Sequence, residues 1–431
     1  MTAGLITETI AGLDVRGLAE AYATPLYVYD AATIRARIAD LRRFDTLRYA
    51  QKANANLSLL ALMQRVGVVL DAVSAGEIFR ALWAGFDPFA DPPGVVYTAD
   101  IFDAAALDLI EAHHVLVNIG SLDMIGQLGQ RCPGRAISLR INPGFGHGHS
   151  RKVNTGGPLS KHGIWYEHLG EACTLAARYE LSVTGLHMHI GSGADIAHLA
   201  QVCQAMLAAV KAVCEAGRPV KHSLRVISAG GGLPVPYGPS DERLDAAAYC
   251  DLWLTTKARA EALVGHPLRL EVEPGRYLVA EAGYLIARVC AIKRTATHTF
   301  YLLDAGFDSL IRPALYGAYH HISICPRGGV RPEGTQPVVV GGPLCEAGDI
   351  FTQDEAGTVL TRDLPPAEVG DLVVVHTTGA YGLAMASNYN SRPLAAEVLI
   401  EDGQARLIRR RQSLQDLIRQ EVADDELDSA R

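Results

Sequence analysis

Lys52 is the first residue of this chain whose type and position suggest chemistry. It follows a short strand-like run that ends at Tyr49 and Ala50. Folds built from alternating strands and helices place catalytic groups directly after their strands. A lysine that loses its proton in a desolvated site can attack a carbonyl carbon, so we predict Schiff-base chemistry at this position. An ordinary surface lysine is the alternative, and only the place after the strand argues against it.

Two histidines, His187 and His189, alternate along a later strand-like run and are followed by glycines and Ser192. The alternation puts both imidazoles on one face of a strand, which suggests zinc, but no third ligand has metal-like spacing. Glycines allow a ligand to approach the backbone closely. We therefore predict that His189 stacks on a flat ring and that Ser192 contacts a phosphate.

The ends of two later strand-like runs carry small residues and charged residues. They are Gly230, Gly231, Gly232, Glu273, Pro274, Gly275 and Arg276. Backbone N–H groups and an arginine that converge form an anion cradle, and β/α barrels commonly hold phosphate after strands seven and eight. A triple glycine alone is typical of any tight turn. If a pyridine ring lies between these loops, Glu273 keeps its nitrogen protonated and makes the ring an electron sink. A buried salt bridge is the alternative for Glu273.

The last third of the chain contains two further glycine-rich clusters, at 342–349 and 379–382. Cys345 and Glu346 lie in the first cluster, and a glycine-flanked loop with such neighbours suggests a functional segment rather than a core thiol. Arg312 precedes a proline and is a candidate carboxylate anchor, because arginine binds carboxylates through two hydrogen bonds. An ordinary turn is the alternative for that stretch.

These residues require a scaffold, and the pattern before residue 275 supplies one. Strand-like runs occur at 46–49, 68–71, 95–98, 115–118, 136–141, 184–189, 224–228 and 268–273. Helical patterns separate them, and Ser74 with Glu77 has the spacing of a capping box at the start of one helix. Alternating strands and helices imply parallel strands, so we predict a closed (β/α)8 barrel of the TIM type.

Domain boundaries follow from changes in this pattern. We predict an N-terminal segment at 1–30 that ends in a strand, a barrel at 31–278 and a β domain at 279–418. The N-terminal strand is expected to join the β domain, and 419–431 is expected to fray. A long polar loop at 143–163 follows the fifth barrel strand, and we interpret it as an active-site lid rather than a disordered connection.

Composition narrows the class of protein. The chain has 431 residues, which suggests two domains, and its net charge of −8 argues against nucleic acid or an anionic membrane as a partner. Its eight cysteines are scattered singly, as expected in a reducing cytoplasm. No apolar leader opens the chain and no uninterrupted apolar run reaches about 18 residues, so export and membrane insertion lack support.

Taken together, the motifs resemble the fold type III pyridoxal-phosphate-dependent decarboxylases. The matching motifs, in chain order, lie at 49–54, 187–192, 230–232, 273–276, 342–346 and 379–381. The stretches at 147–165 and 388–393 resemble the enterobacterial-type branch that acts on meso-2,6-diaminopimelate. The resemblance covers roughly residues 25–415, and it is the combination of motifs that is specific.

The resemblance implies that pyridoxal 5′-phosphate is the cofactor and that Lys52 binds it covalently. It also implies that His189 stacks on the ring and that Glu273 partners the ring nitrogen. Further cofactor contacts implied in this way are Asp71, Ser192, Gly230, Gly231, Gly232, Gly275, Arg276 and Tyr381.

The same resemblance implies a substrate site and an assembly. Arg276, Arg312 and Tyr316 would hold a distal carboxylate, Glu346 a distal ammonium group, and Tyr381 would also line the site. Cys345 would protonate the substrate carbon after CO₂ leaves, from a loop that enters the neighbouring subunit of a homodimer.

The implied reaction is decarboxylation of meso-2,6-diaminopimelate to L-lysine, the last step of bacterial lysine synthesis. The alternatives are a decarboxylase of D-lysine, D-ornithine or a siderophore precursor, and a non-catalytic pyridoxal-phosphate-binding homologue.

Overall fold

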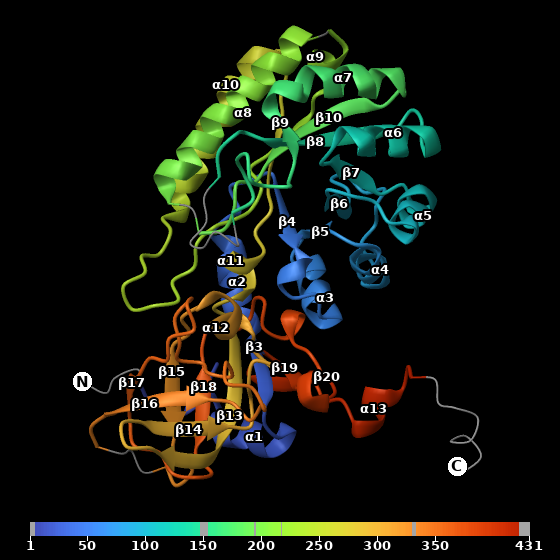
Figure 1. Cartoon of the computed structure of the whole chain (residues 1–431). Coiled ribbons are helices and arrows are strands. Elements are labelled where there is room, and N and C mark those ends of the chain that lie inside the picture. Colours follow the sequence, from blue (N-terminus) through green and yellow to red (C-terminus); the bar gives the residue numbers. More distant parts are fainter. Residues whose placement is uncertain (1–4, 147–153, 194, 217, 330–332, 422–431) are drawn as a thin grey trace, which may run out of the picture. The chain divides into compact units, whose positions relative to one another are not determined.

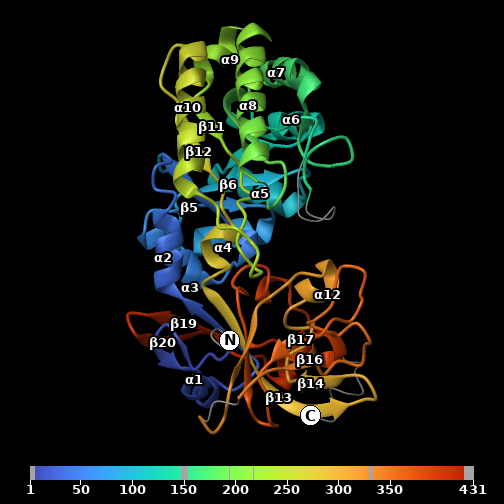
Figure 2. The ribbon, with the colours of Figure 1, turned by 90° about the vertical axis from the view of Figure 1, so that its left-hand side faces the viewer.

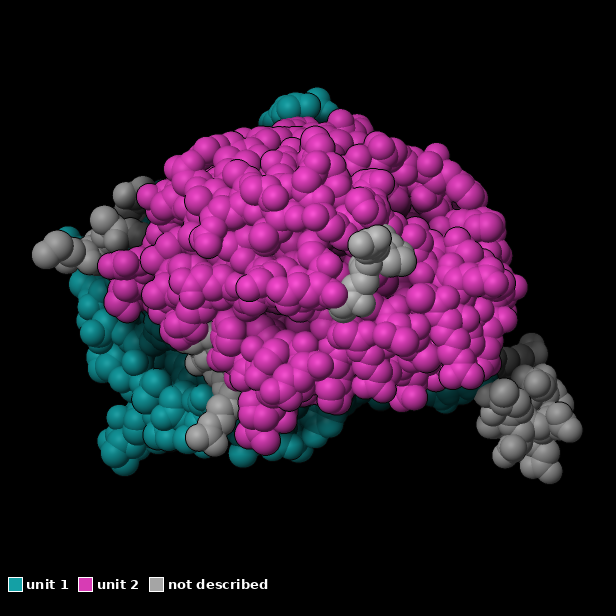
Figure 3. Space-filling view, turned by 90° about the horizontal axis from the view of Figure 1, so that it is seen from above, with its two compact units in different colours: residues 1–32, 281–431 teal, residues 33–280 magenta. Residues whose placement is uncertain are grey.

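The computed structural model describes residues 5–146, 154–193, 195–216, 218–329 and 333–421. The chain divides into two compact units, which Figure 3 colours separately. One unit is Thr33–Ala280, and the other combines Met1–Ala32 with Glu281–Arg431. Most of the tail that was expected to fray, 422–431, lies outside the described residues.

The first unit is a closed barrel of eight parallel strands, as the sequence predicted. Each of these eight strands pairs with the next of them along the chain, and the last pairs with the first. Figure 1 shows the elements of the chain in the colours of the sequence. The strands are β4 (Thr46–Ala50), β5 (Val69–Ala72), β6 (Val95–Ala99), β7 (Leu116–Ile119), β8 (Ala136–Asn142), β10 (Ser182–Met188), β11 (Val226–Ser228) and β12 (Arg269–Val272).

Helices cover the outside of the barrel, as Figure 2 shows from a second side. They are α2 (Ala31–Ala39), α3 (Leu57–Arg65), α4 (Ala75–Trp83), α5 (Ala104–His113), α6 (Leu122–Arg131), α7 (Leu169–Arg178), α8 (Ile196–Ala216), α9 (Arg218–Ser223) and α10 (Ala246–Val264). Polar N-cap side chains start several of them. The predicted capping box of α4 forms only in part, because Glu77 accepts from the backbone of Val73 instead of Ser74.

One barrel helix, α8, is the single helix of the described chain that is long and apolar enough to cross a membrane. Length and composition are the only grounds for this, and core helices of water-soluble proteins pass the same test. In this structure α8 packs beside α7 and α10 in the helical layer of the barrel. His198 and Lys211 interrupt its apolar sequence.

The inside of the barrel contains charged groups as well as apolar side chains. Arg48 of β4 and Glu271 of β12 are both buried and form an ion pair with a nitrogen–oxygen distance of 3.0 Å. Arg48 also donates to the carbonyl oxygen of Pro93. Because a buried charge without a partner is strongly destabilising, these contacts allow an arginine inside the barrel.

The predicted lid is described only at its two ends. Asn142, the last residue of β8, accepts hydrogen bonds from the backbone of Gly144 and of Gly157 at 3.1 and 2.9 Å, which ties the two ends together. A short strand, β9 (Ile164–Trp165), then pairs with β8. Residues 147–153, in the middle of this loop, lie outside the described residues.

The second unit is built on β-sheet. Strand β3 (Leu26–Asp30) lies between β13 (Gly283–Arg294) and β19 (Ala396–Glu401), so the N-terminal strand joins the β domain as predicted. The other elements of this unit are β1 (Thr9–Ile10), β2 (Leu13–Asp14), α1 (Val15–Tyr22), β14 (Thr299–Leu303), α12 (Arg312–Tyr316), β15 (Ile322–Cys325), β16 (Gln336–Gly341), β17 (Arg362–Leu364), β18 (Leu372–Val375), β20 (Gln404–Arg409) and α13 (Leu414–Ile418). Apolar side chains of β3, β13, β18 and β19 form its core together with α1.

Candidate active site

One rim of the barrel gathers most of the residues that the sequence singled out. Carboxyl ends of parallel strands meet at the same edge, so residues that follow different strands come together there. The gathered residues are Lys52 after β4, Asp71 in β5, His189 and Ser192 after β10, Gly230, Gly231 and Gly232 after β11, and Glu273, Gly275 and Arg276 after β12. Lys52 is exposed, and its positive charge acts on both Asp71 and His189.

The triple glycine is required by the close packing of backbone at this rim. Gly230 and Gly232 have φ angles of 61° and 96°, which favour glycine. A Cβ atom at Gly232 would overlap the carbonyl oxygen of Gly191, and one at Gly230 would overlap that of Met188. Gly230 also accepts a hydrogen bond from the backbone of Glu273 at 2.7 Å. Three strand ends therefore approach one another with only backbone between them.

Glu273 is a buried carboxylate whose two oxygens each have a partner. His187 Nε2 lies 2.6 Å from Oε2, and the Ser228 hydroxyl donates to Oε1 at 3.2 Å. Burial by itself raises the pKa of Glu273, but the charge and the hydrogen bond of His187 outweigh it, with help from more distant arginines. The net pKa is below its ordinary value, so the carboxylate is ionised at neutral pH.

Burial disfavours the charged forms of both His189 and Asp71. Burial, together with the positive charges of Arg140 and Lys52, lowers the pKa of His189 well below its usual range. Burial and the negative charge of Glu273 raise the pKa of Asp71 well above its usual range. The rim therefore combines a neutral imidazole with two buried carboxyl groups whose pKa values move in opposite directions.

Arg276 and Gly275 form the last part of this rim. Arg276 begins the short helix α11 (Arg276–Val279) and donates to the hydroxyl of Tyr237 at 3.0 Å. A Cβ atom at Gly275 would lie 3.1 Å from the carbonyl oxygen of Ala50, at the end of β4. Gly275 thus allows β4 and the loop after β12 to lie against each other, directly before the arginine.

In the second unit, Arg312 is oriented by a chain of hydrogen bonds. It begins α12, is buried, and its Nη1 lies 2.8 Å from Nε2 of His320. Nδ1 of His320 lies 2.9 Å from the carbonyl oxygen of His376, which can only accept. Nδ1 must therefore carry the proton, which leaves Nε2 as the acceptor for Arg312. Tyr316, at the other end of α12, is half-buried.

Cys345 and Glu346 lie in an exposed loop after β16 that a distant segment holds in place. Asn390 accepts a hydrogen bond from the backbone of Cys345 at 2.8 Å, and the hydroxyl of Tyr389 lies 3.5 Å from Glu346. Asp349 closes the base of the loop by accepting from the backbone of Leu344 at 2.8 Å.

Tyr381 lies in another loop of this unit, the one after β18. Its φ angle is 57°, which is uncommon for a residue with a side chain.

The barrel rim fits pyridoxal 5′-phosphate. A glycine cradle and Arg276 suit a phosphate, a neutral imidazole suits the face of a flat ring, and an ionised buried carboxylate suits a protonated ring nitrogen. The exposed Lys52 supplies an amine at the same rim.

Sequence reasoning missed some partners of these residues. His187 was singled out with His189 as a possible zinc pair, but its Nε2 is directed to Glu273, 86 residues away. Ser228 and Asn118, which are buried in β11 and β7, had no signal except their places in strands.

Comparisons with known proteins show the family of the chain. The family model for the pyridoxal binding domain of pyridoxal-dependent decarboxylases matches residues 32–280. The barrel is therefore the pyridoxal binding domain of a pyridoxal-dependent decarboxylase.

The relatives narrow the class further. The chain is 52% identical to diaminopimelate decarboxylase of Escherichia coli K12 over 403 residues, which cover 93% of this chain and 94% of the relative. It is 52% identical to the enzyme of that name from Streptomyces coelicolor, with 93% and 90% covered. A crystal structure of a diaminopimelate decarboxylase matches with a TM-score of 0.89 and 51% identity, covering 93% of this chain and 94% of that one. The chain belongs to the diaminopimelate decarboxylase family of the pyridoxal-dependent decarboxylases.

Proposed function

We propose that this protein decarboxylates meso-2,6-diaminopimelate to L-lysine and CO₂ with pyridoxal 5′-phosphate, as the last step of lysine synthesis. The observation that carries the reaction class is the buried carboxylate of Glu273 at the barrel rim, where His187 and Ser228 hold both of its oxygens. The choice of substrate is supported by the names of the relatives. A diaminopimelate decarboxylase of Helicobacter pylori, 31% identical, has also been crystallised with L-lysine.

When bound, pyridoxal 5′-phosphate supplies an electron sink for the electron pair that CO₂ leaves behind. In this proposal Lys52 binds the cofactor covalently, and the neutral His189 packs on its ring. Glu273 keeps a negative charge beside the ring nitrogen, which holds a proton there. The phosphate and the rest of the cofactor are assigned to Asp71, Ser192, Gly230, Gly231, Gly232, Gly275, Arg276 and Tyr381.

The distal end of the substrate is assigned to Arg276, Arg312, Tyr316, Glu346 and Tyr381. meso-Diaminopimelate has a carboxylate and an ammonium group at this end, whereas D-lysine has only the ammonium. His320 supports the assignment of Arg312, because it fixes the guanidinium in one orientation before substrate arrives. An arginine held in this way loses little conformational freedom when it binds a carboxylate.

Cys345 is assigned as the acid that protonates the substrate carbon after CO₂ leaves. We also infer a homodimer in which the loop of Cys345 and Glu346 completes the site of the partner subunit. Both side chains are exposed, and Asn390 and Asp349 hold the loop in shape, which suits a segment that reaches a second copy. We place the enzyme in the cytoplasm, where the eight unpaired cysteines are expected.

The function is tested by supplying purified protein and cofactor with meso-diaminopimelate, D-lysine and D-ornithine in parallel. L-Lysine and CO₂ should form from meso-diaminopimelate, and turnover of the other two should be at least about 100-fold lower in kcat/KM, because neither offers a distal carboxylate. A preference for D-lysine or D-ornithine would contradict the assigned substrate. The absence of turnover of all three by cofactor-loaded protein would contradict a decarboxylase.

A further inference from the structure

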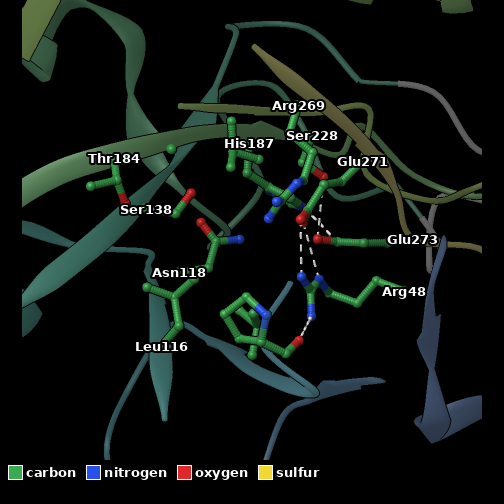
Figure 4. A pocket seen from close by; sticks show the side chains of 14 residues that line it. Arg48, Leu116, Asn118, Ser138, Thr184, His187, Ser228, Arg269, Glu271 and Glu273 are labelled. Atoms are coloured by element: carbon green, nitrogen blue, oxygen red, sulfur yellow. Dashed lines mark hydrogen bonds and ion pairs between the residues drawn. The ribbon is translucent and has the colours of Figure 1, made fainter. Parts of the chain in front are cut away.

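The inside of the barrel contains a cavity of about 40 Å³ that has several polar side chains in its lining (Figure 4). It is lined by side chains of several strands, including Asn118 of β7, His187 and Thr184 of β10, Ser228 of β11, and Glu273. A buried water needs roughly 10–15 Å³ of such space and two to four polar partners. The cavity therefore has room for more than one water.

Three polar atoms of the cavity lining have no hydrogen-bond partner within the described part of the chain. They are Nδ1 of His187 and both amide atoms, Nδ2 and Oδ1, of Asn118. The two side chains are only 1% and 2% exposed. Buried polar atoms without partners are uncommon in folded proteins because they lose their hydrogen bonds to water on folding. A water donates and accepts, so it can satisfy Nδ1 and the amide together.

The other ring nitrogen of His187, Nε2, contacts Glu273. A carboxylate has only lone pairs, so Nε2 of His187 donates to Oε2 and the Ser228 hydroxyl donates to Oε1. Ser228 is fixed in turn, since its oxygen accepts from the backbone of Gly230 at 3.2 Å. Both oxygens of Glu273 are thus held in place, and His187 lies between this carboxylate and the cavity.

We propose that the cavity is a bound-water site and that His187, held between that water and Glu273, is a positioning residue for the Glu273 carboxylate. This inference rests on the proposed role of Glu273 beside the ring nitrogen of the cofactor. Other charged groups also influence Glu273. The positive charges of Arg48 and Arg140 lower its pKa, although Arg48 is itself paired with Glu271. The charges of Glu273 and Asp71 also act on each other. His187 and Ser228 are the cavity side chains that contact Glu273 directly, and of these two it is His187 that also has a polar atom, Nδ1, without a partner in the described part of the chain.

The test compares two probes that differ only at the ring nitrogen. Cofactor-free protein is titrated with pyridoxal 5′-phosphate and with its 1-deaza analogue, which has carbon in place of that nitrogen. The unchanged protein should bind pyridoxal 5′-phosphate more tightly, so the dissociation constant of the analogue divided by that of pyridoxal 5′-phosphate should exceed one. His187→Leu should reduce this ratio by about tenfold or more, since a hydrogen bond to a charged group is lost. His187→Gln, which keeps an N–H donor, should restore most of the preference.

Controls separate positioning from simple damage to the barrel. Thr184→Val changes another cavity side chain, one that donates to the carbonyl of Ile137, and should leave the ratio unchanged. Ser228→Ala should lower the ratio in the same direction as His187→Leu, and it tests the proposal even if His187→Leu does not fold. Equal weakening of both probes by His187→Leu would overturn the positioning role.

The bound water is tested separately. A crystal structure of the cofactor-loaded enzyme should show ordered water within about 3.2 Å of Nδ1 of His187 and of the Asn118 amide. Asn118→Leu, which has nearly the same shape, should lower Tm because hydrogen bonds to that water are lost. If the amide has no partner, the same change removes an unsatisfied group and raises Tm, which would overturn the water site. None of these measurements uses substrate, so failure of meso-diaminopimelate turnover would leave them interpretable.

Discussion

At the scale of single residues, neighbours decide in which direction the pKa of a buried carboxyl group moves. Glu273 and Asp71 are both buried carboxyl groups of the barrel rim, yet their pKa values move in opposite directions. Glu273 has a hydrogen bond and a charge from His187, whereas Asp71 has burial and the negative charge of Glu273 acting against ionisation. In the proposed site, Glu273 would supply the anion that a protonated ring nitrogen needs beside it.

Lys52 should be the covalent attachment point of the cofactor. Borohydride treatment of the loaded protein should fix the cofactor on the peptide that contains Lys52, as mass spectrometry of a digest will show. Lys52→Ala should abolish turnover and change the free energy of unfolding by less than about 0.5 kcal/mol, because the side chain is exposed. Labelling of a different lysine would refute the assignment.

Arg312 should discriminate between substrates. Arg312→Ala removes a charge-assisted contact to the distal carboxylate and should lower kcat/KM for meso-diaminopimelate by about 30- to 1,000-fold, or 2–4 kcal/mol. The residual turnover of D-lysine, which lacks that carboxylate, serves as the internal control and should change little. An equal loss for both substrates would mean that Arg312 supports the fold through His320 rather than the substrate.

At the scale of elements, the proposed phosphate cradle depends on loops that pack backbone against backbone. The loops after β10, β11 and β12 meet at the triple glycine, where hydrogen bonds of 2.7 and 2.8 Å join Glu273 to Gly230 and Gly193 to Gly232. Side chains have no room at this point. The shape of the cradle is therefore set by three strand ends and not by one loop alone.

Gly232→Ala should damage the barrel far more than a matched glycine change. Gly265, which ends α10, has a φ angle of 83° against 96° at Gly232, but a Cβ atom there meets nothing within 4 Å. Gly265→Ala should cost about 1 kcal/mol of unfolding free energy from backbone strain alone. Gly232→Ala should cost at least about 2 kcal/mol more and weaken cofactor binding, because its Cβ overlaps the carbonyl of Gly191. Urea unfolding of both variants measures the difference, and similar costs would contradict the close packing.

At the scale of the whole molecule, the proposed chemistry is divided between the two units. Lys52 belongs to the barrel, whereas Cys345 belongs to the β unit with its exposed loop. The proposed acid and all the proposed distal contacts except Arg276 belong to the β unit. The proposed homodimer therefore decides which barrel they serve.

Mixing two inactive variants tests the shared site. Lys52→Ala and Cys345→Ala homodimers should each be nearly inactive. After subunit exchange about half of the dimers are mixed, and each mixed dimer has one site with both residues intact, so about a quarter of the original activity should return. Exchange itself is followed by mass spectrometry of differently tagged subunits. If exchange occurs without any recovery, both residues serve the same subunit.

The sequence by itself determined the elements and many of the candidate residues. Apolar periodicity and turn residues act over a few positions, which is why all eight barrel strands were predicted within about two residues of their observed ends. Motif residues such as Lys52 were found for the same reason, since they directly follow strands. Only the tertiary structure decided which distant groups meet. The contacts of Glu273 with His187, of Arg312 with His320 and of Cys345 with Asn390 depend on strand register, barrel closure and loop packing, which no local pattern encodes.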